Sequence, residues 1–196
     1  METTTVRFTL DGAVNPLYAN FVPTGEYSGL MTLPRELSLC ETDEGYRLKT
    51  KPFGIDEYRA GAFPIGNQKP LLTESFGLLV QGNFGRIALK NSRGEEVVIE
   101  VTVDSITVDR SKSGNLSYFE DVDPKLLQKR GSAGIQQQKR YMRGNVNMEI
   151  IFDVSYLEIY ADGGLETASV CVYPDAPYQV VSTDGDLEVK MYTIKK

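Results

Sequence analysis

The strongest candidates for ligand binding are three side chains spaced two residues apart. Tyr156, Glu158 and Tyr160 lie in FDVSYLEIYA, whose period of two is typical of a β-strand. The alternation places all three on one face and the apolar residues between them on the other. Aromatic rings around a carboxylate can stack on a sugar and bind its hydroxyls, so this face is a candidate carbohydrate site. An ordinary solvated strand face has the same pattern and is the more common case.

A second chemical feature is the adjacent pair of opposite charges in LPRELSL. Pro34 lacks an N–H, so it is expected at a sheet edge or a bulge. Neighbouring residues of an extended chain point to opposite faces, so Arg35 and Glu36 cannot pair with each other. One of the two charges should therefore point inward and find a partner elsewhere, as at a junction between two parts of a protein.

No residue set favours catalysis, a metal or a cofactor. The chain has no histidine, which removes the most common general base, the most common metal ligand and every histidine-dependent triad. No spacing among its 27 acidic residues singles out a catalytic pair. The turn Asp162-Gly163-Gly164 is not part of an EF-hand loop, because the ligand spacing of that loop is absent. We expect no catalytic residue, no metal and no cofactor.

The composition bounds the class of protein. The 196 residues suit one domain with at most a short extension, and the net charge of −6 argues against a nucleic-acid partner. No apolar run approaches the roughly 20 residues of a membrane span. The first residues, METTT, do not form a signal peptide, which slightly favours the cytoplasm. Cys40 and Cys171 sit in strand-like patterns and are expected to be reduced structural residues.

A long polar segment, residues 111–145, interrupts the apolar pattern. It is weakly helical around 124–129 and could bind an anion or form a solvated loop. The acidic residues Glu120, Asp121 and Asp123 offset its positive charge and favour the loop. Its basic residues are Lys125, Lys129, Arg130, Lys139, Arg140 and Arg143.

Period-two alternation dominates the rest of the chain. GRIALKN (85–91) and EEVVIEVTV (95–103) flank a turn and predict a hairpin. Another strand follows at 105–111, and 147–174 predicts further strands around a glycine turn. Residues 55–59 predict a short helical turn. About ten or eleven short strands separated by turn residues predict an all-β fold, a two-sheet antiparallel β-sandwich of the concanavalin A-like or jelly-roll type.

The order of several motifs resembles glycoside hydrolase family 32, the invertase, levanase and inulinase group. YANFVPTGEYSGLMTLPRELSL resembles the junction where this family's catalytic propeller passes into a C-terminal β-sandwich. EGYRLKTKP, DSITVDRSKSG, FDVSYLEIYADGG and TASVCVYP follow in the family's order. The resemblance implies a propeller-like N-terminal segment at 1–28 and a β-sandwich at 29–196. It also implies a domain interface at Tyr18, Phe21, Tyr27, Met31, Arg35 and Glu36.

Departures from the family pattern concern the catalytic residues. The family's N-D-P-N-G nucleophile motif, its R-D-P motif and its E-C acid/base motif do not occur in this chain. Tyr27 stands where the family has tryptophan, and Ser28 where it has arginine. The resemblance therefore implies that the catalytic propeller is missing and that the chain alone is not an enzyme.

Three functions remain open. The chain could pack against another domain or oligomerise, with a homodimer or a separately encoded propeller as partner. It could bind fructan or another oligosaccharide through Tyr156, Glu158 and Tyr160. It could also be one half of a split β-fructosidase, which predicts sucrose hydrolysis only in a mixture with the other half.

Overall fold

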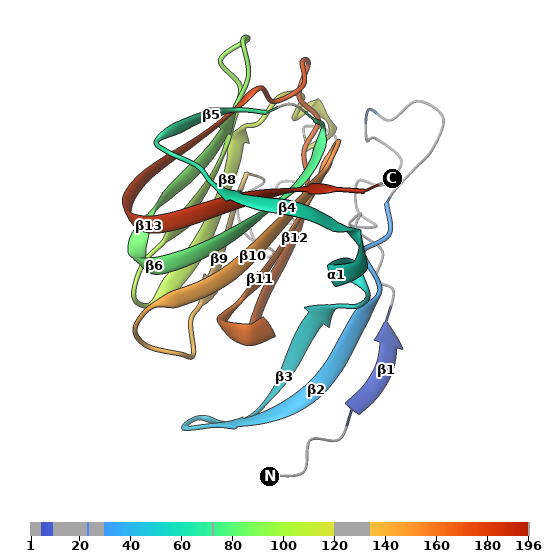
Figure 1. Ribbon diagram of the computed structural model, residues 1–196, viewed down its shortest axis with the longest axis vertical. Coiled ribbons are helices and arrows are strands. Elements are labelled where there is room, and N and C mark those ends of the chain that lie inside the picture. The colour runs from blue at the N-terminus through green and yellow to red at the C-terminus, as the bar shows by residue number, and fades with distance from the viewer. Residues whose placement is uncertain (1–4, 10–22, 24–29, 72, 120–133, 196) are drawn as a thin grey trace.

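Strands near the N-terminus form a sheet of their own. The computed structural model describes residues 5–9, 23, 30–71, 73–119 and 134–195. Strands β1 (Thr5–Thr9), β2 (Arg35–Thr42) and β3 (Gly45–Pro52) form an antiparallel sheet in the order β1-β2-β3. This three-stranded sheet lies below the rest of the molecule in Figure 1. The short helix α1 (Ile55–Tyr58) leads out of it, at the position expected for a helical turn.

The remaining strands belong to a ten-stranded sheet. Its central path runs β12-β11-β10-β6-β7-β8-β9, while β13 lies beside β6 and also pairs with β4 and β5. Two short 3₁₀ helices, η1 (Ser117–Phe119) and η2 (Asp162–Gly164), interrupt the connections. The strands are β4 (Arg59–Pro64), β5 (Gln68–Pro70), β6 (Ser75–Lys90), β7 (Glu96–Val101), β8 (Ser105–Lys112), β9 (Ile135–Lys139), β10 (Val146–Asp153), β11 (Tyr156–Ala161), β12 (Glu166–Cys171) and β13 (Val180–Ile194).

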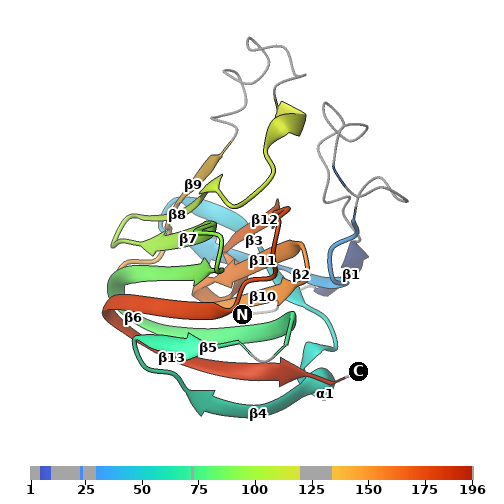
Figure 2. The same ribbon diagram turned by 90° about the horizontal axis from the view of Figure 1, so that it is seen from above.

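Two long strands fold this sheet into two layers. The first half of β6 pairs with β10, and its second half pairs with β7, so β6 belongs to both layers; β13 follows it along its whole length. Both strands bend where backbones approach too closely for side chains. A Cβ added to Gly82 would lie 1.9 Å from the carbonyl oxygen of Asp186. The register of β13 shifts between Gly185 and Leu187. The result is the expected two-sheet antiparallel β-sandwich, seen from above in Figure 2.

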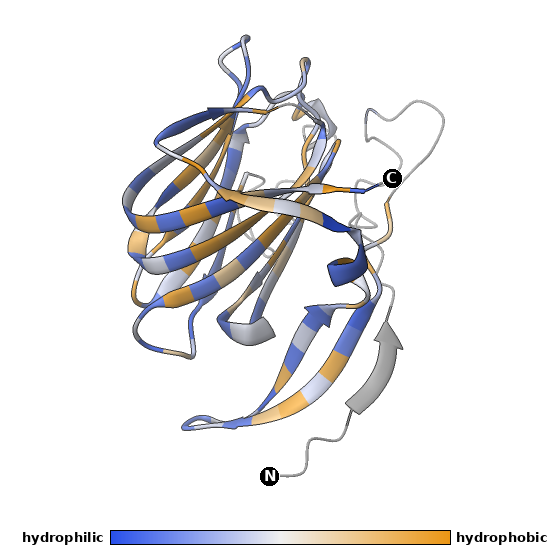
Figure 3. Ribbon diagram, viewed as in Figure 1, coloured by the Kyte–Doolittle hydropathy of each residue, from blue (hydrophilic) through white to orange (hydrophobic). Residues whose placement is uncertain are grey.

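The apolar core fills the space between the layers. Alternating apolar and polar residues along the strands are visible in Figure 3. Strand β11 departs from simple alternation in burial because all six of its residues are buried. Leu157 and Ile159 belong to the core, whereas Tyr160 packs with Ile55 and Ile151 on the opposite side of the layer. The outer face of β11 is therefore covered by another part of the chain.

The expected division at residue 29, into an N-terminal segment and a β-sandwich domain, stays a prediction. Residues 35–52, on the sandwich side of that division, contain β2 and β3 of the three-stranded sheet. Among the described strands, β2 pairs with β1 and β3 alone. The hairpin predicted at 85–103 is confirmed as β6 and β7. Within the segment expected to be a polar loop, residues 135–139 form β9, while 120–133 lie outside the described residues.

Candidate functional site

A buried ion pair joins the three-stranded sheet to the sandwich. Nη2 of Arg35, the first residue of β2, lies 2.7 Å from Oε2 of Glu158 in β11. The two side chains are only 11% and 3% exposed. The Arg35 guanidinium also donates to Ser169 Oγ at 2.6 Å and to Tyr160 Oη at 3.2 Å. Three residues of the sandwich thus hold one arginine of the neighbouring sheet.

Both oxygens of the Glu158 carboxylate accept hydrogen bonds at this contact. Its Oε1 accepts the backbone N–H of Leu33 at 2.7 Å, and its Oε2 accepts the hydroxyl of Tyr160 at 2.5 Å. Burial, reinforced by the Glu158 charge, raises the pKa of Tyr160, so its hydroxyl remains a donor. Burial is the largest single effect on Arg35 and lowers its pKa, but the hydrogen bonds and charges of Glu158 and Tyr160 together outweigh it, so the pKa of Arg35 lies above its ordinary value. The network is a hydrogen-bonded charged contact in which both Glu158 oxygens are paired.

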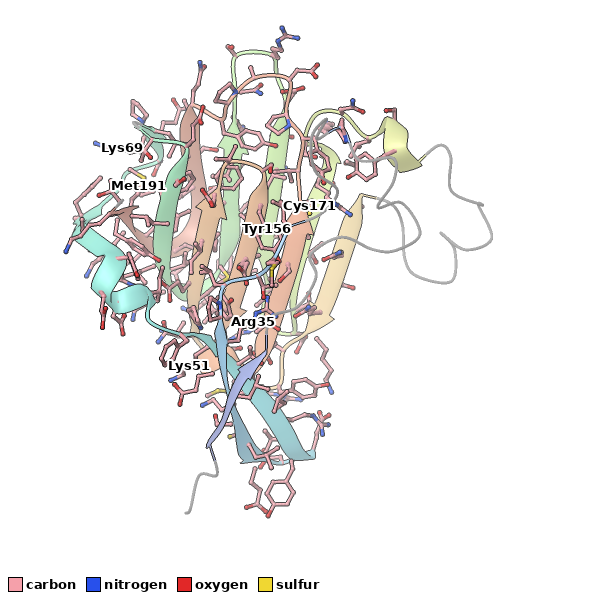
Figure 4. All side chains as sticks on the ribbon, turned by 90° about the vertical axis from the view of Figure 1, so that its right-hand side faces the viewer. Arg35, Lys51, Lys69, Tyr156, Cys171 and Met191 are labelled. Atoms are coloured by element: carbon pink, nitrogen blue, oxygen red, sulfur yellow. The ribbon has the colours of Figure 1, made fainter. Side chains whose placement is uncertain are left out.

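Strand alternation explains the direction of the side chains on both β2 and β11. Within β2, Arg35 is buried and Glu36 is exposed, so Arg35 is the charge that points inward. On β11 the same alternation turns Glu158 and Tyr160 away from the core. Figure 4 shows Arg35 and Tyr156 where the start of β2 meets the outer face of the sandwich.

The candidate carbohydrate residues share one face but do not lie open to solvent. Tyr156, Glu158 and Tyr160 are 7%, 2% and 4% exposed. Both oxygens of the Glu158 carboxylate already accept hydrogen bonds, from Leu33, Arg35 and Tyr160. Carbohydrate binding at this face remains a prediction.

The candidate interface residues fall into two groups. Arg35 and Glu36 lie at the start of β2, and Met31 is 64% exposed just before it. Tyr18, Phe21 and Tyr27 lie outside the described residues.

A cavity of about 470 Å³ adjoins the Arg35–Glu158 pair. Its walls come from the segment before β2, from α1 and from the outer face of the sandwich, and Tyr156 and Glu158 form part of one wall. The apolar residues that line it are Met31, Leu33, Pro34, Ile55, Ile151 and Ile194. The cavity can receive an apolar side chain, but it presents no catalytic constellation.

A second buried ion pair was missed from the sequence. Nε of Arg140 lies 2.8 Å from Oδ2 of Asp162, with side-chain exposures of 0% and 2%. The acidic residues that offset its positive charge favour a solvated loop for the segment that contains Arg140, whereas the structure buries this side chain. In the sequence, Asp162-Gly163-Gly164 marks a tight turn, and its three residues have positive φ angles in the structure.

The described residues offer no alternative site of the usual kinds. No group of three or more histidine, cysteine, aspartate or glutamate side chains is arranged to hold a metal in the described ranges. Within the same ranges, no helix has the length and apolarity to cross a membrane. Cys40 and Cys171 are not joined by a disulfide, and Cys171 is buried.

Comparison with known proteins gives consistent matches. Levanase of Bacillus subtilis (strain 168) is 24% identical over 96% of this chain, and the match spans 30% of levanase. The exo-inulinase of Aspergillus awamori superposes with a TM-score of 0.77 at 18% identity, covering 95% of this chain and 40% of that one. The sucrose-6-phosphate hydrolase of Lactobacillus gasseri gives 0.74 at 16% identity, covering 96% and 38%. These structural likenesses show a shared fold.

A family model decides the classification. The model described as "Glycosyl hydrolases family 32 C terminal" matches residues 66–196, which include β6 to β13 and hence both layers of the sandwich. The chain spans less than half the length of each relative named above. By this match the chain belongs to the glycosyl hydrolase family 32 C-terminal family, a family of β-sandwich domains.

Proposed function

We propose that this chain is a non-catalytic C-terminal module of a family 32 β-fructosidase, and that it packs through its three-stranded sheet against the family's catalytic propeller. The proposal rests on the family match and on the relatives, which are a levanase and an exo-inulinase. It assigns the sandwich a structural role and places the contact surface on β1, β2 and β3.

The observation that carries this proposal is an exposed apolar face on the three-stranded sheet. Leu39 of β2 lies opposite Leu48 of β3, and both are more than half exposed, at 55% and 51%. Tyr46 lies on the same face of β3, two residues before Leu48, and is 70% exposed; its cross-strand partner is Glu41 of β2. Large apolar side chains gathered on a solvent face are typical of a surface that another protein covers.

The open edge of the same sheet supports this assignment. Among the described strands, β1 pairs only with β2, so no described residue pairs with its other edge. Such an edge favours addition of a further strand. An apolar face beside an open edge fits a partner that is itself a β-sheet, as the propeller of this family is.

The non-catalytic role is supported by two of the three buried carboxyl groups among the described residues. Glu158 and Asp162 are each neutralised by an arginine, at 2.7 and 2.8 Å respectively. A glycosidase needs two carboxyl groups facing a substrate cleft, one to attack or activate water and one to protonate the leaving group. Neither of these two buried carboxylates is free for that work.

The test combines an activity assay with a measurement of association. The purified chain is incubated with sucrose, inulin and levan, and released fructose is measured. We expect none above a heat-inactivated control. Fructose released by the chain alone would overturn the non-catalytic role.

Association is measured by light scattering across about a hundredfold range of protein concentration. With its apolar face uncovered, the wild-type chain should self-associate. Leu48→Lys should reduce this association, while Val103→Lys, at a residue that is also 50% exposed but lies in the β7–β8 turn, should not. A wild-type chain that stays monomeric throughout, or equal effects of the two variants, would contradict the proposed surface.

A further inference from the structure

A buried carboxyl group without a counter-charge of its own lies next to the Arg140–Asp162 pair. Glu166, the first residue of β12, is only 3% exposed. Its Oε1 accepts the backbone N–H of Tyr141 at 2.7 Å, whereas its Oε2 is buried and has no hydrogen-bond partner among the described residues. A buried acceptor left in this state is costly, and a proton on it would turn it into a donor.

The surroundings favour that proton. The nearby Asp162 carboxylate is held by two bonds from Arg140, Nε to Oδ2 at 2.8 Å and Nη2 to Oδ1 at 3.1 Å. One arginine charge thus faces two carboxyl groups. Burial is the main cause that raises the pKa of Glu166 to about 7, and the negative charge of Asp162 adds to it, against the opposing effects of the Tyr141 N–H and Arg140.

The cluster is linked to the three-stranded sheet through the η2 turn. Asp162 begins η2, and Gly164 ends it against β3: a Cβ added to Gly164 would lie 2.2 Å from the carbonyl oxygen of Thr50. A Cβ on Gly163 would lie 3.2 Å from Nζ of Lys49. The backbones of η2 and β3 are therefore packed closely enough that no side chain fits between them.

A second link runs through Tyr141. Its N–H is the donor to Glu166, and its ring lies 4.7 Å from the Arg47 guanidinium of β3, measured to the ring centroid. Lys139, two residues earlier, reaches Glu44 at the tip of the β2–β3 hairpin at 2.5 Å. Both connections of Glu166, by way of η2 and by way of Tyr141, therefore end on the same hairpin.

We propose that Glu166, Asp162 and Arg140 form a pH-sensitive latch that controls how firmly the three-stranded sheet is docked on the sandwich. With a proton on Glu166, the carboxyl group bonds to the Asp162 carboxylate, and η2 holds its place against Thr50. When that proton is lost, two carboxylates share one arginine, η2 is strained, and the hairpin loosens. Arg140 and Asp162 lie beside Glu166. The other charged groups around it are Lys139 of β9, Arg143 between β9 and β10, and Glu44, Arg47 and Lys49 of the β2–β3 hairpin.

The direction of the pH effect follows from linkage. The docked state holds the Glu166 proton more tightly than a state in which the carboxyl group meets water, so docking is strongest below the ordinary pKa of 4.5. Docking should weaken as the pH rises from there through about 7. If undocking exposes Glu166 fully, the docking constant should fall on the order of fiftyfold between pH 5 and pH 8.

Hydrogen exchange of the peptide covering 45–52 measures docking directly, after correction for the intrinsic pH dependence of exchange. Wild-type protection of β3 should fall between pH 5 and pH 8. Glu166→Gln mimics the protonated side chain and should keep β3 protected at both pH values. Glu188→Gln, at an exposed position of β13, is the matched control and should retain the wild-type pH dependence.

Two results would overturn the latch. One is wild-type β3 protection that does not change with pH. The other is a Glu166→Gln protein whose β3 exchange still follows the wild-type pH dependence. If that variant does not fold, a ¹³C NMR titration of the Glu166 carboxyl in the wild-type chain decides, because a midpoint near 4.5, its ordinary value, excludes the proposal.

Discussion

The sandwich and the three-stranded sheet are stabilised in different ways. The sandwich encloses a continuous apolar core drawn from both of its layers, in which Leu78, Ile150 and Leu157 are completely buried. No residue of β2 or β3 belongs to that core. The smaller sheet is held instead by the Arg35 network, by the close contact of η2 with β3, and by a few apolar residues around Ile55.

This difference has an energetic consequence. The stabilisation from apolar burial adds up over many side chains and does not depend on pH. A buried ion pair contributes little net free energy, and removing one partner is strongly destabilising. We therefore expect the sandwich to carry most of the free energy of unfolding and the three-stranded sheet to open first. The changes below test that ordering, from the largest effect to the smallest.

Leu157→Ala should have the largest effect. Leu157 is fully buried in the core, so its truncation leaves a cavity and should lower the free energy of unfolding by about 2–5 kcal/mol. Urea denaturation followed by circular dichroism measures the loss. Leu157→Met, which conserves volume, is the control and should cost less than about 1.5 kcal/mol. A loss from Leu157→Ala as small as that of the control would mean that the core is not the main source of stability.

Arg35→Ala should act on the smaller sheet. It leaves the buried Glu158 carboxylate without its counter-charge, a loss of up to about 3–5 kcal/mol in docking. Undocking limits the loss, because water can then reach Glu158. Hydrogen exchange should accelerate in β3 and remain slow in β10. Arg86→Ala, at an exposed arginine of β6, is the control and should change hydrogen exchange in neither β3 nor β10. Global unfolding of the Arg35 variant would contradict the idea that the three-stranded sheet opens separately from the sandwich.

Gly164→Ala tests the backbone contact between η2 and β3. Gly164 has φ of 94°, and an added Cβ would collide with the Thr50 carbonyl, so we expect a loss of about 1–3 kcal/mol. Gly94→Ala has a similar φ of 78° but meets no atom within 4 Å, so it reports backbone strain alone. Thermal unfolding of both variants separates the contact from the strain. Equal shifts in Tm would show that the contact contributes nothing.

Leu48→Ala should have the smallest effect on the isolated chain. The side chain is 51% exposed, and truncation of an exposed residue changes the free energy of unfolding by about 0.5 kcal/mol or less. Urea denaturation at low protein concentration checks this. A loss of about 2 kcal/mol or more would show that Leu48 is covered in solution, and that the apolar face is not free.

Much of the sandwich could be predicted from the local sequence pattern, but the contacts between distant segments of the chain could not. The alternation around Ile87 and Ile99 correctly predicted the β6–β7 hairpin, because side-chain period and turn residues are local properties. The pairing of β2 with β1 and β3 could not be predicted, because a strand's pattern does not say which sheet it joins. The segment that contains Arg140 was interpreted as a solvated loop because its charges offset one another, and nothing local indicates that Arg140 pairs with Asp162 in another segment.

By itself the sequence determined that the chain is all-β, that it resembles family 32, and that either Arg35 or Glu36 must point inward. These follow from residue type, motif order and the two faces of an extended strand. Only the tertiary structure decided that the inward charge is Arg35 and that it meets Glu158, 123 positions along the chain. It also decided that Glu158 is covered and that Glu166 shares one arginine with Asp162. The reason is physical: burial and charge pairing depend on which distant surfaces meet, and local periodicity carries no record of that.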